Sequence, residues 1–478
     1  MLFNSLAYLA FLPVVFVVYW LLNRKSLQLQ HLFLLGASYF FYACWDWRFL
    51  FLLIFSTGLD YFTGLKMANA RSLWTKKTWF WISIVINLGF LGVFKYYNFF
   101  VDSFADLLRN FGLTPHFYTL QIVLPVGISF YTFHGLSYVI DIYKDRIEAE
   151  KNPVDYALFV SYFPLLVAGP IERATHLLPQ LKKRRVFSSE KAIDGINQIV
   201  WGLFKKVVIA DSCASYANAV FADSASANSL SLFLGAVYFA FQIYGDFSGY
   251  SDIALGTSKL FGIDLLRNFN YPYFSRDIAE FWRRWHISLS SWFRDYLYVP
   301  LGGSRGGMWM KVRNTFIIFI VSGFWHGAKW TFIAWGFLNA LYFLPLLLSN
   351  NNRNHLVIVA KDSILPSFRD FLRISITFFL TTIAWIFFRA DSITDAFQYI
   401  THLFSADFAG GVQQLSIERY SVELLPLLLL FMVFEWHSRL HEHPFFGRFS
   451  TAKMGMVLIA LLLFGVYSEA GNFIYFQF

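Results

Sequence analysis

Apolar stretches long enough to cross a lipid bilayer recur along the chain and limit most strongly how it can fold. A membrane-spanning helix needs about 20 mostly apolar residues. Stretches near that length lie at 2–22, 31–45, 49–65, 79–97, 122–142, 193–210, 229–247, 313–327, 329–348, 371–389, 424–437 and 454–470. Backbone inside lipid must satisfy its own hydrogen bonds, so these stretches predict helices. We expect an all-α polytopic membrane protein.

The composition agrees with a membrane protein and argues against a soluble one. Hydrophobic residues fill 57% of the 478 positions and charged residues only 14%, so a soluble fold would expose large apolar patches. Lys and Arg number 39 against 30 Asp and Glu, but they lie between the apolar stretches, where they act as orientation signals. We therefore expect contact with membrane lipids and no nucleic-acid partner.

The basic segments between the apolar stretches predict the topology. They lie at 23–30, 66–78, 143–154, 171–192, 248–312, 349–370 and 438–453. The positive-inside rule assigns all of them to the cytoplasm, which puts both termini outside. Arg24 and Lys25 follow the first apolar stretch rather than precede it, so we expect a retained first span and not a cleaved signal peptide.

One apolar segment, 155–170, lies between two basic segments that are both predicted to be cytoplasmic. We interpret it as re-entrant, ending at the breaker pair Gly169–Pro170. No internal repeat or linker is visible, so residues 1–478 are expected to form a single domain.

The charged segment from Asp246 to Arg313 is too long for a turn and too polar to span a membrane. Within 276–297, large apolar residues recur at helical spacing: Ile278, Phe281, Trp282, Trp285, Leu289, Trp292, Phe293 and Tyr296. The pattern predicts an interfacial amphipathic helix. A plain anchor for anionic lipid would show the same pattern, so the helix alone does not identify a site.

Two histidines, His286 and His326, stand in tryptophan-rich apolar sequence. An ionisable group at membrane depth is a candidate functional residue, and a neutral imidazole can act as a general base. A hydrogen-bonded packing role is the plainer alternative for either residue. No carboxylate or cysteine stands at ligand spacing beside them, and Cys44 and Cys213 form no Cys-x-x-Cys pair, so we expect neither a metal site nor a disulfide framework.

A set of short motifs resembles the membrane-bound O-acyltransferase family, in particular its alginate O-acetyltransferase branch. In chain order they are Gly127-Ile-Ser-Phe-Tyr131, Ala168-Gly-Pro-Ile-Glu-Arg173, Asp246-Phe-Ser-Gly-Tyr-Ser-Asp252, Asn268-Phe-Asn-Tyr-Pro272, Phe281-Trp-Arg-Arg-Trp-His286, Asp295-Tyr-Leu-Tyr298, Pro300-Leu-Gly-Gly303 and Trp325-His-Gly327. The match covers nearly the whole chain, with core motifs over 121–348 and C-terminal helices over 371–478.

This resemblance implies a fold and a catalytic residue. The fold would be a ring of roughly 11–13 tilted transmembrane helices around a thinned centre, with re-entrant and interfacial amphipathic helices. The family's catalytic histidine corresponds to His326 and its second histidine to His286. For His286, orienting a helix, binding the donor or positioning an acyl carbonyl all stay open beside direct catalysis.

The C-terminal hexapeptide Phe473-Ile-Tyr-Phe-Gln-Phe478 resembles a segment of related acyl-export systems, in which its tyrosine is implicated as an acyl carrier. By that resemblance Tyr475 accepts an acetyl group with help from His326. An aromatic residue of the membrane interface is the alternative.

The resemblance further implies an acetyl relay. A cytoplasmic thioester, acetyl-CoA or another acyl thioester, would donate the group, and no cofactor would be bound permanently. A periplasmic acetyltransferase partner and the export machinery would pass it to a polysaccharide, which places the protein in a bacterial inner membrane. A transporter or flippase and a non-catalytic scaffold of an export complex are the alternatives. The polymer acetylated is left open.

Overall fold

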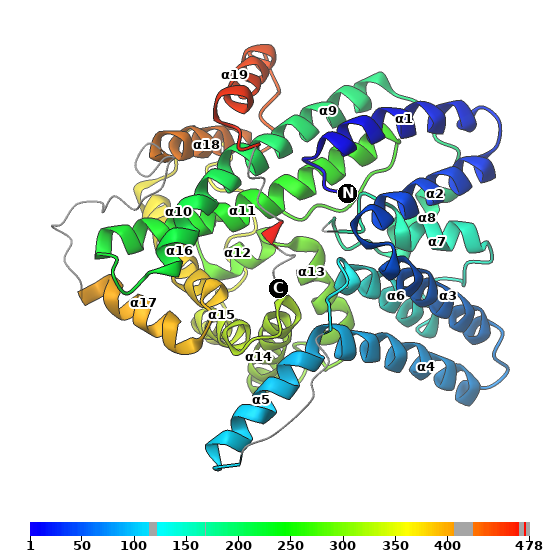
Figure 1. The fold of residues 1–478 in the computed structure, drawn as a ribbon, viewed down its shortest axis with the longest axis horizontal. Helices are drawn as coiled ribbons and strands as arrows, with labels where there is room; N and C mark the ends of the chain where they lie inside the picture. Colours follow the sequence, from blue (N-terminus) through cyan, green and yellow to red (C-terminus); the bar gives the residue numbers. More distant parts are fainter. Residues whose placement is uncertain (114–121, 168, 406–423, 468–472, 475–478) are drawn as a thin grey trace. The chain divides into compact units, whose positions relative to one another are not determined.

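The computed structural model describes residues 1–113, 122–167, 169–405, 424–467 and 473–474, and the regular structure of these ranges is helical (Figure 1). Six of the described helices are long and apolar enough to cross a membrane: Leu6–Asn23, Arg48–Ala68, Leu73–Asn110, Ser229–Leu260, Trp330–Leu348 and Phe368–Arg389. The prediction of an all-α polytopic membrane protein is confirmed. The expected ring around a thinned centre stays a prediction.

The described chain divides into two compact units. Unit 1 comprises Met1–Ala192 and Thr257–Leu266, and unit 2 comprises Ile193–Gly256 and Arg267–Phe478. That residues 1–478 behave as a single domain stays a prediction.

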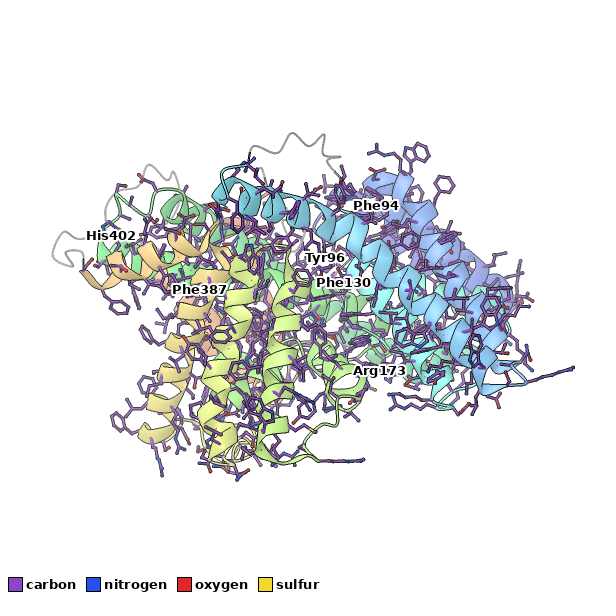
Figure 2. The ribbon with its side chains drawn as sticks, turned by 90° about the horizontal axis from the view of Figure 1, so that it is seen from below. Phe94, Tyr96, Phe130, Arg173, Phe387 and His402 are labelled. Carbon is purple, nitrogen blue, oxygen red and sulfur yellow. The ribbon has the colours of Figure 1, made fainter. Side chains whose placement is uncertain are left out.

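Unit 1 is built on the first helices of the chain. They are α1 (Leu6–Asn23), α2 (Leu27–Asp46), α3 (Arg48–Ala68), α4 (Leu73–Leu91), η1 (Gly92–Tyr96), α5 (Tyr97–Asn110), α6 (Ile128–Tyr143), α7 (Pro153–Ser161) and α8 (Ala174–Lys182). Helices α3, α4 and α6 pack side by side (Figure 1). Figure 2 shows α4, η1 and α5 following one another as one continuous helix, with Phe94 and Tyr96 on its π-helical middle part.

The segment 155–170 holds only a short helix. Helix α7 ends at Ser161, and the described residues between it and Gly169–Pro170 are not helical, so the segment is re-entrant only as a prediction. The nine residues of α7 are about 14 Å long, less than half the hydrocarbon thickness of a bilayer. The side chains of Phe163 and Leu165 beyond it are fully buried in unit 1. The non-helical backbone is therefore surrounded by protein, as a re-entrant segment requires.

Unit 2 holds most of the remaining helices, and α9 and α11 contribute residues to both units. The elements are α9 (Ser189–Leu203), η2 (Phe204–Ala210), α10 (Asp211–Ala222), α11 (Ser229–Leu260), η3 (Pro272–Phe274), α12 (Ile278–Arg284), α13 (Ile287–Phe293), η4 (Arg294–Tyr298), α14 (Gly307–His326), α15 (Trp330–Leu348), α16 (Phe368–Arg389), α17 (Ile393–Ser405), α18 (Leu424–Ser438) and α19 (Ser450–Phe464).

Helix α11 is longer than the sequence predicts. We expected a span over 229–247 followed by a cytoplasmic segment from Asp246, but α11 continues to Leu260. Most of its polar residues do not face water, because α11 packs directly on the helix that ends at Leu203: a Cβ at Gly249 would collide with the carbonyl oxygen of Gly202. Small residues at such a contact let two helix backbones touch. Within the most apolar 18-residue stretch of α11, 83% is buried in the protein.

Helices α14 and α15 form a tight hairpin, as the closely joined stretches 313–327 and 329–348 predict (Figure 1). A Cβ at Gly323 would collide with the carbonyl oxygen of Phe332, and one at Gly336 with that of Phe319. Both collisions involve backbone atoms, which cannot swing away. The two helices therefore meet backbone to backbone near the end of α14, where His326 is the last residue.

Candidate active site

His286 lies at a break between α12 and α13. Its φ of 44° is in the left-handed region, which costs a residue with a Cβ about 1–2 kcal/mol. The continuous helix predicted over 276–297 is therefore wrong. Most of its apolar side chains are buried in protein instead of lying free on a membrane surface; these are Ile278, Phe281, Trp285, Leu289, Trp292, Phe293 and Tyr296.

The segment from Asn268 to Asn270 pairs with the backbone at this break. The N–H of Ile287 donates to the carbonyl of Asn268 at 2.8 Å, and the N–H of Asn270 donates to the carbonyl of Arg284 at 3.0 Å. The hydroxyl of Ser288 donates to Oδ1 of Asn268 at 2.5 Å. The break is therefore stabilised by specific hydrogen bonds, which replace those that a continuous helix would make.

His326 is the last residue of α14, immediately before Gly327, where the backbone becomes extended. A side chain at Gly327 would collide with the ring of Phe332, so the chain can leave the helix here only through glycine. The imidazole is 3% exposed and has the rings of Trp335 and Phe388 at 5.2 and 5.4 Å between centroids. The helix end therefore presents His326 to a buried aromatic environment.

The structure brings the two predicted histidines together. Their ring centroids are 6.4 Å apart, and His286 is only 1% exposed. Neither ring nitrogen of His286 has a hydrogen-bond partner within the described part of the chain. Burial disfavours the charged imidazole and lowers the pKa of His286, so this ring is neutral near pH 7. A neutral imidazole can accept a proton or donate a hydrogen bond through its N–H.

Tryptophans enclose the pair on one side. The ring of Trp335 stacks on Trp385 at 5.5 Å and also contacts Trp282 at 5.6 Å. Trp325 lies 6.0 Å from His286. Large aromatic side chains exclude water, which strengthens electrostatic interactions with a reacting group.

A pocket of about 510 Å³ opens in unit 2; neither His286 nor His326 lines it, but residues one helical turn from each do. Ser290 and Ser322, four residues from His286 and His326 respectively, both line it. Three cationic side chains line it as well: Arg294, Lys311 and Arg353. Arg294 pairs with Asp295, whereas Lys311 and Arg353 form no ion pair with a carboxylate in the ranges that the structure describes. The pocket thus combines an apolar wall, hydroxyl groups and positive charge.

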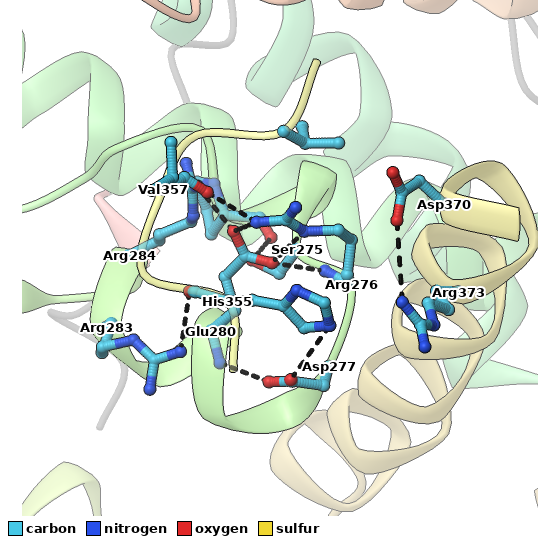
Figure 3. A network of polar contacts seen from close by, with 12 residues as sticks. Ser275, Arg276, Asp277, Glu280, Arg283, Arg284, His355, Val357, Asp370 and Arg373 are labelled. Atoms are coloured by element: carbon cyan, nitrogen blue, oxygen red, sulfur yellow. Dashed lines mark hydrogen bonds and ion pairs between the residues drawn. The ribbon is translucent and has the colours of Figure 1, made fainter. Parts of the chain in front are cut away.

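The α15–α16 connection forms part of the pocket and is held by Arg283 of α12 and by Arg276, just before α12 (Figure 3). The guanidinium of Arg283 donates to the carbonyls of Asn352 and His355 at 2.8 and 3.0 Å. Arg276 and Arg284 both bind Glu280 and neutralise that buried carboxylate, and Arg276 also donates to the carbonyl of Val357 in the same connection. The backbone on both sides of Arg353 is therefore fixed by Arg283.

The third predicted site residue, Tyr475, lies outside the described residues. Phe473 and Ile474, just before it, are described, and each is 1% exposed. Burial in unit 2 is not what an aromatic belt at the membrane interface requires of these two residues.

The sequence interpretation missed a buried ionic cluster. Lys205 and Lys206 fall inside the predicted span 193–210 and are each 4% exposed. Their partners include Asp246 and Asp252 of α11. The signal was available, since a charge inside an apolar stretch marks a functional or structural site. Among the described residues no group of three His, Cys, Asp or Glu could hold a metal ion.

Comparison with known proteins identifies the family. A sequence model described as MBOAT, the membrane-bound O-acyltransferase family, matches residues 144–379. The probable alginate O-acetylase AlgI of Pseudomonas aeruginosa is 40% identical over 419 residues, which cover 87% of this chain and 76% of that protein. The chain belongs to the membrane-bound O-acyltransferase family. It is therefore a multi-pass membrane O-acyltransferase, and the resemblance seen in the motifs is confirmed.

Two further relatives differ in the polymer that they are named for. The probable alginate O-acetylase AlgI of Azotobacter vinelandii is 39% identical over 440 residues, 91% of this chain and 84% of that protein. The peptidoglycan O-acetyltransferase of Helicobacter pylori is 37% identical over 430 residues, 84% of this chain and 79% of that protein. Both acetylate sugar polymers according to their names.

Proposed function

We propose that the protein moves an acetyl group from a cytoplasmic thioester donor across the inner membrane of a bacterium for O-acetylation of an exported polysaccharide. The observation that carries this proposal is the buried histidine pair, one helical turn from two serines of a pocket that cationic side chains also line. The relatives named for alginate and peptidoglycan acetylation support the class of acceptor.

His326 would be the general base. A hydroxyl oxygen attacks the thioester carbonyl carbon, a C–O bond forms and the C–S bond breaks. The hydroxyl proton passes to His326 and then to the leaving thiolate, so the reaction is balanced without another reactant. General base catalysis of this kind contributes about 10²–10⁴-fold to the rate.

His286 would support this step and not take the proton. Its neutral N–H can donate to the carbonyl oxygen of the acyl group, where negative charge develops. The absence of a hydrogen-bond partner for either ring nitrogen, within the described ranges, supports this role, because such a group is available to a substrate.

The donor would be acetyl-CoA, bound in the 510 Å³ pocket. That volume lies within the range of about 300–1,000 Å³ usual for small-molecule sites. Lys311 and Arg353 suit the phosphates of the nucleotide, and Ser290 and Ser322 stand one helical turn from the two histidines. No permanent cofactor is needed for this chemistry.

The attacking hydroxyl would be that of Tyr475, and the acetyl ester formed there would pass its acyl group onward to a periplasmic acetyltransferase partner of the export machinery. A phenol with a pKa near 10 is a poor nucleophile without a base, but its acyl ester is activated and transfers readily. That reactivity suits an intermediate carrier.

The test compares three histidine variants, each in cells that carry the variant as their only copy. His326→Ala should lower the acetyl content of the exported polymer about 100-fold or more, because the base is lost. His402→Ala, on α17 outside the pocket, is the matched control and should keep it. His286→Ala should reduce it less completely.

Release of free thiol from acetyl-CoA by the purified protein in liposomes tests the donor separately. Wild-type polymer acetylation in the His326→Ala strain would refute the catalytic role. A scaffold would retain acetylation in both histidine variants.

A further inference from the structure

Lys206 and Asp246 form a buried ion pair that the proposed chemistry does not use. Lys206 lies on the π-helical turn η2, and its Nζ is 2.8 Å from Oδ1 of Asp211 and 2.9 Å from Oδ1 of Asp246. The side chains of all three residues are 4% exposed. A buried charge is costly unless it is paired and its remaining oxygens are hydrogen-bonded. The second oxygen of Asp246 therefore needs a donor.

That donor comes from the C-terminal segment. The backbone N–H of Ile474 donates to Oδ2 of Asp246 at 2.7 Å, across 228 positions of sequence. The ring of Phe473 packs on Tyr250 of α11 at 4.6 Å and on Phe247 at 6.2 Å. Residues 473–474 are thus held on α11 by one charged hydrogen bond and by aromatic packing.

The aromatic residue Phe247 connects this C-terminal segment to the candidate active site. Phe247, which contacts Phe473, has its ring 4.7 Å from that of His286 in an edge-on arrangement. Only one side chain therefore separates the held segment from the histidine pair.

A neighbouring ion pair, between Lys205 of η2 and Asp252 of α11, has a similar construction but no hydrogen bond to the described residues of the C-terminal segment. Lys205 lies 3.0 Å from Asp252 and 3.2 Å from Glu435. Gln198 donates to the other oxygen of Asp252 at 3.1 Å, so this carboxylate is satisfied within unit 2 without residues 473–474. Two lysines in a row thus hold two α11 carboxylates, and one of these carboxylates holds the C-terminal segment.

We propose that Asp246, fixed by Lys206, anchors the C-terminal segment at Ile474 beside His286, and that acyl transfer requires this anchoring. Asp246 is then a positioning residue and does not touch the reacting atoms. The requirement for transfer rests on the proposed function, whereas the anchoring itself does not. A fixed segment restricts where a C-terminal acceptor can lie, and proximity of this kind accelerates a transfer step.

Hydrogen–deuterium exchange of the Ile474 amide tests the anchoring directly. The full-length protein is purified in detergent, and the C-terminal peptide is fragmented so that the exchange of this amide is resolved. Asp246→Ala should speed its exchange about tenfold or more, the factor expected for losing a hydrogen bond to a charged group. Asp246→Asn keeps an acceptor oxygen and should retain part of the protection. Asp252→Ala is the matched control and should leave the exchange at Ile474 unchanged.

Polymer acetylation in cells carrying the same variants tests whether acyl transfer requires the anchoring of the C-terminal segment. Asp246→Ala should lower it about tenfold or more, with recovery in Asp246→Asn. Unchanged exchange at Ile474 in Asp246→Ala, or equal acceleration in Asp252→Ala, would overturn the anchoring. Faster exchange with normal acetylation would overturn the requirement for transfer. If the wild-type protein acetylates nothing, the proposed function fails, and the exchange result still decides the anchoring.

Discussion

The proposal that the pocket binds the acyl donor makes a specific prediction about two arginines, of which one lines the pocket and the other does not. Arg353 lines the pocket, whereas Arg283 holds the backbone on either side of it through the carbonyls of Asn352 and His355. Replacing Arg353 by Ala removes a charge that the proposal assigns to the donor phosphates. Replacing Arg283 by Ala frees the backbone that carries this charge. Both variants should raise the KM for acetyl-CoA with little change in kcat.

The size of the effect follows from where Arg353 lies. Two unit charges 4 Å apart interact by about 1 kcal/mol in water and by about 4 kcal/mol at an effective dielectric constant of 20. Arg353 is exposed, which favours the lower part of that range, about 1–2 kcal/mol. The KM should therefore rise about 5- to 30-fold in Arg353→Ala. Arg283→Ala should have a similar or smaller effect, since it acts only through the position of Arg353.

The double variant is the decisive measurement. Initial rates of thiol release from acetyl-CoA, measured in liposomes, give KM and kcat for each single variant and for the pair. If Arg283 acts through Arg353, the pair should have nearly the KM of Arg353→Ala alone, because coupled residues are not additive. Arg373→Ala on α16 controls for the loss of one positive charge near this network (Figure 3). Multiplied single effects, or an unchanged KM in Arg353→Ala, would refute the reasoning.

Three further predictions test the carrier, the packing and the topology. Tyr475→Phe removes only a hydroxyl, so polymer acetylation should be nearly lost if this residue carries the acyl group; normal acetylation would sink the idea. Gly323→Ala should lower the free energy of unfolding by about 1–3 kcal/mol through a clash with backbone, and thermal unfolding in detergent measures this against Gly455→Ala, where nothing lies within 4 Å. A cysteine at Ser226 should react with an impermeant thiol reagent from outside, and one at Ser188 should not; labelling at Ser188 would reverse the assigned topology.

Local patterns predicted the C-terminal ends of several helices well. The apolar stretches 31–45, 313–327 and 329–348 end within one residue of α2, α14 and α15, whereas α2 and α14 begin several residues before the stretches do. Apolar runs and breakers act over a few residues, so they are readable in one sequence. The tryptophan-rich apolar context marked both His286 and His326 as candidates, but no local pattern predicts that residues 40 positions apart come together in space.

The errors have a common physical cause. Asp246 was assigned to a cytoplasmic segment and α12–α13 to a single interfacial helix because polar or amphipathic sequence was taken to face water or lipid. In the structure Asp246 faces Lys206, and the apolar residues of α12 and α13 face other helices. A polar side chain reveals that it needs a partner but not whether that partner is water or a distant part of the chain. The left-handed backbone at His286 has no signal in the sequence, since histidine does not favour it as glycine would.

The glycine contact between α14 and α15 has a consequence for how the enzyme tolerates its membrane. Bilayers differ in thickness with lipid chain length, and helices separated by long side chains can slide or tilt to adapt. Where backbones touch at Gly323 and Gly336, such sliding would force peptide groups into one another. The hairpin therefore responds to a thicker or thinner bilayer as one stiff piece, and the spacing between the end of α14 and the tryptophans of α15 does not change with the surrounding lipid. A change in growth temperature that remodels the lipids would alter how this hairpin sits in the membrane before it altered the geometry around His326.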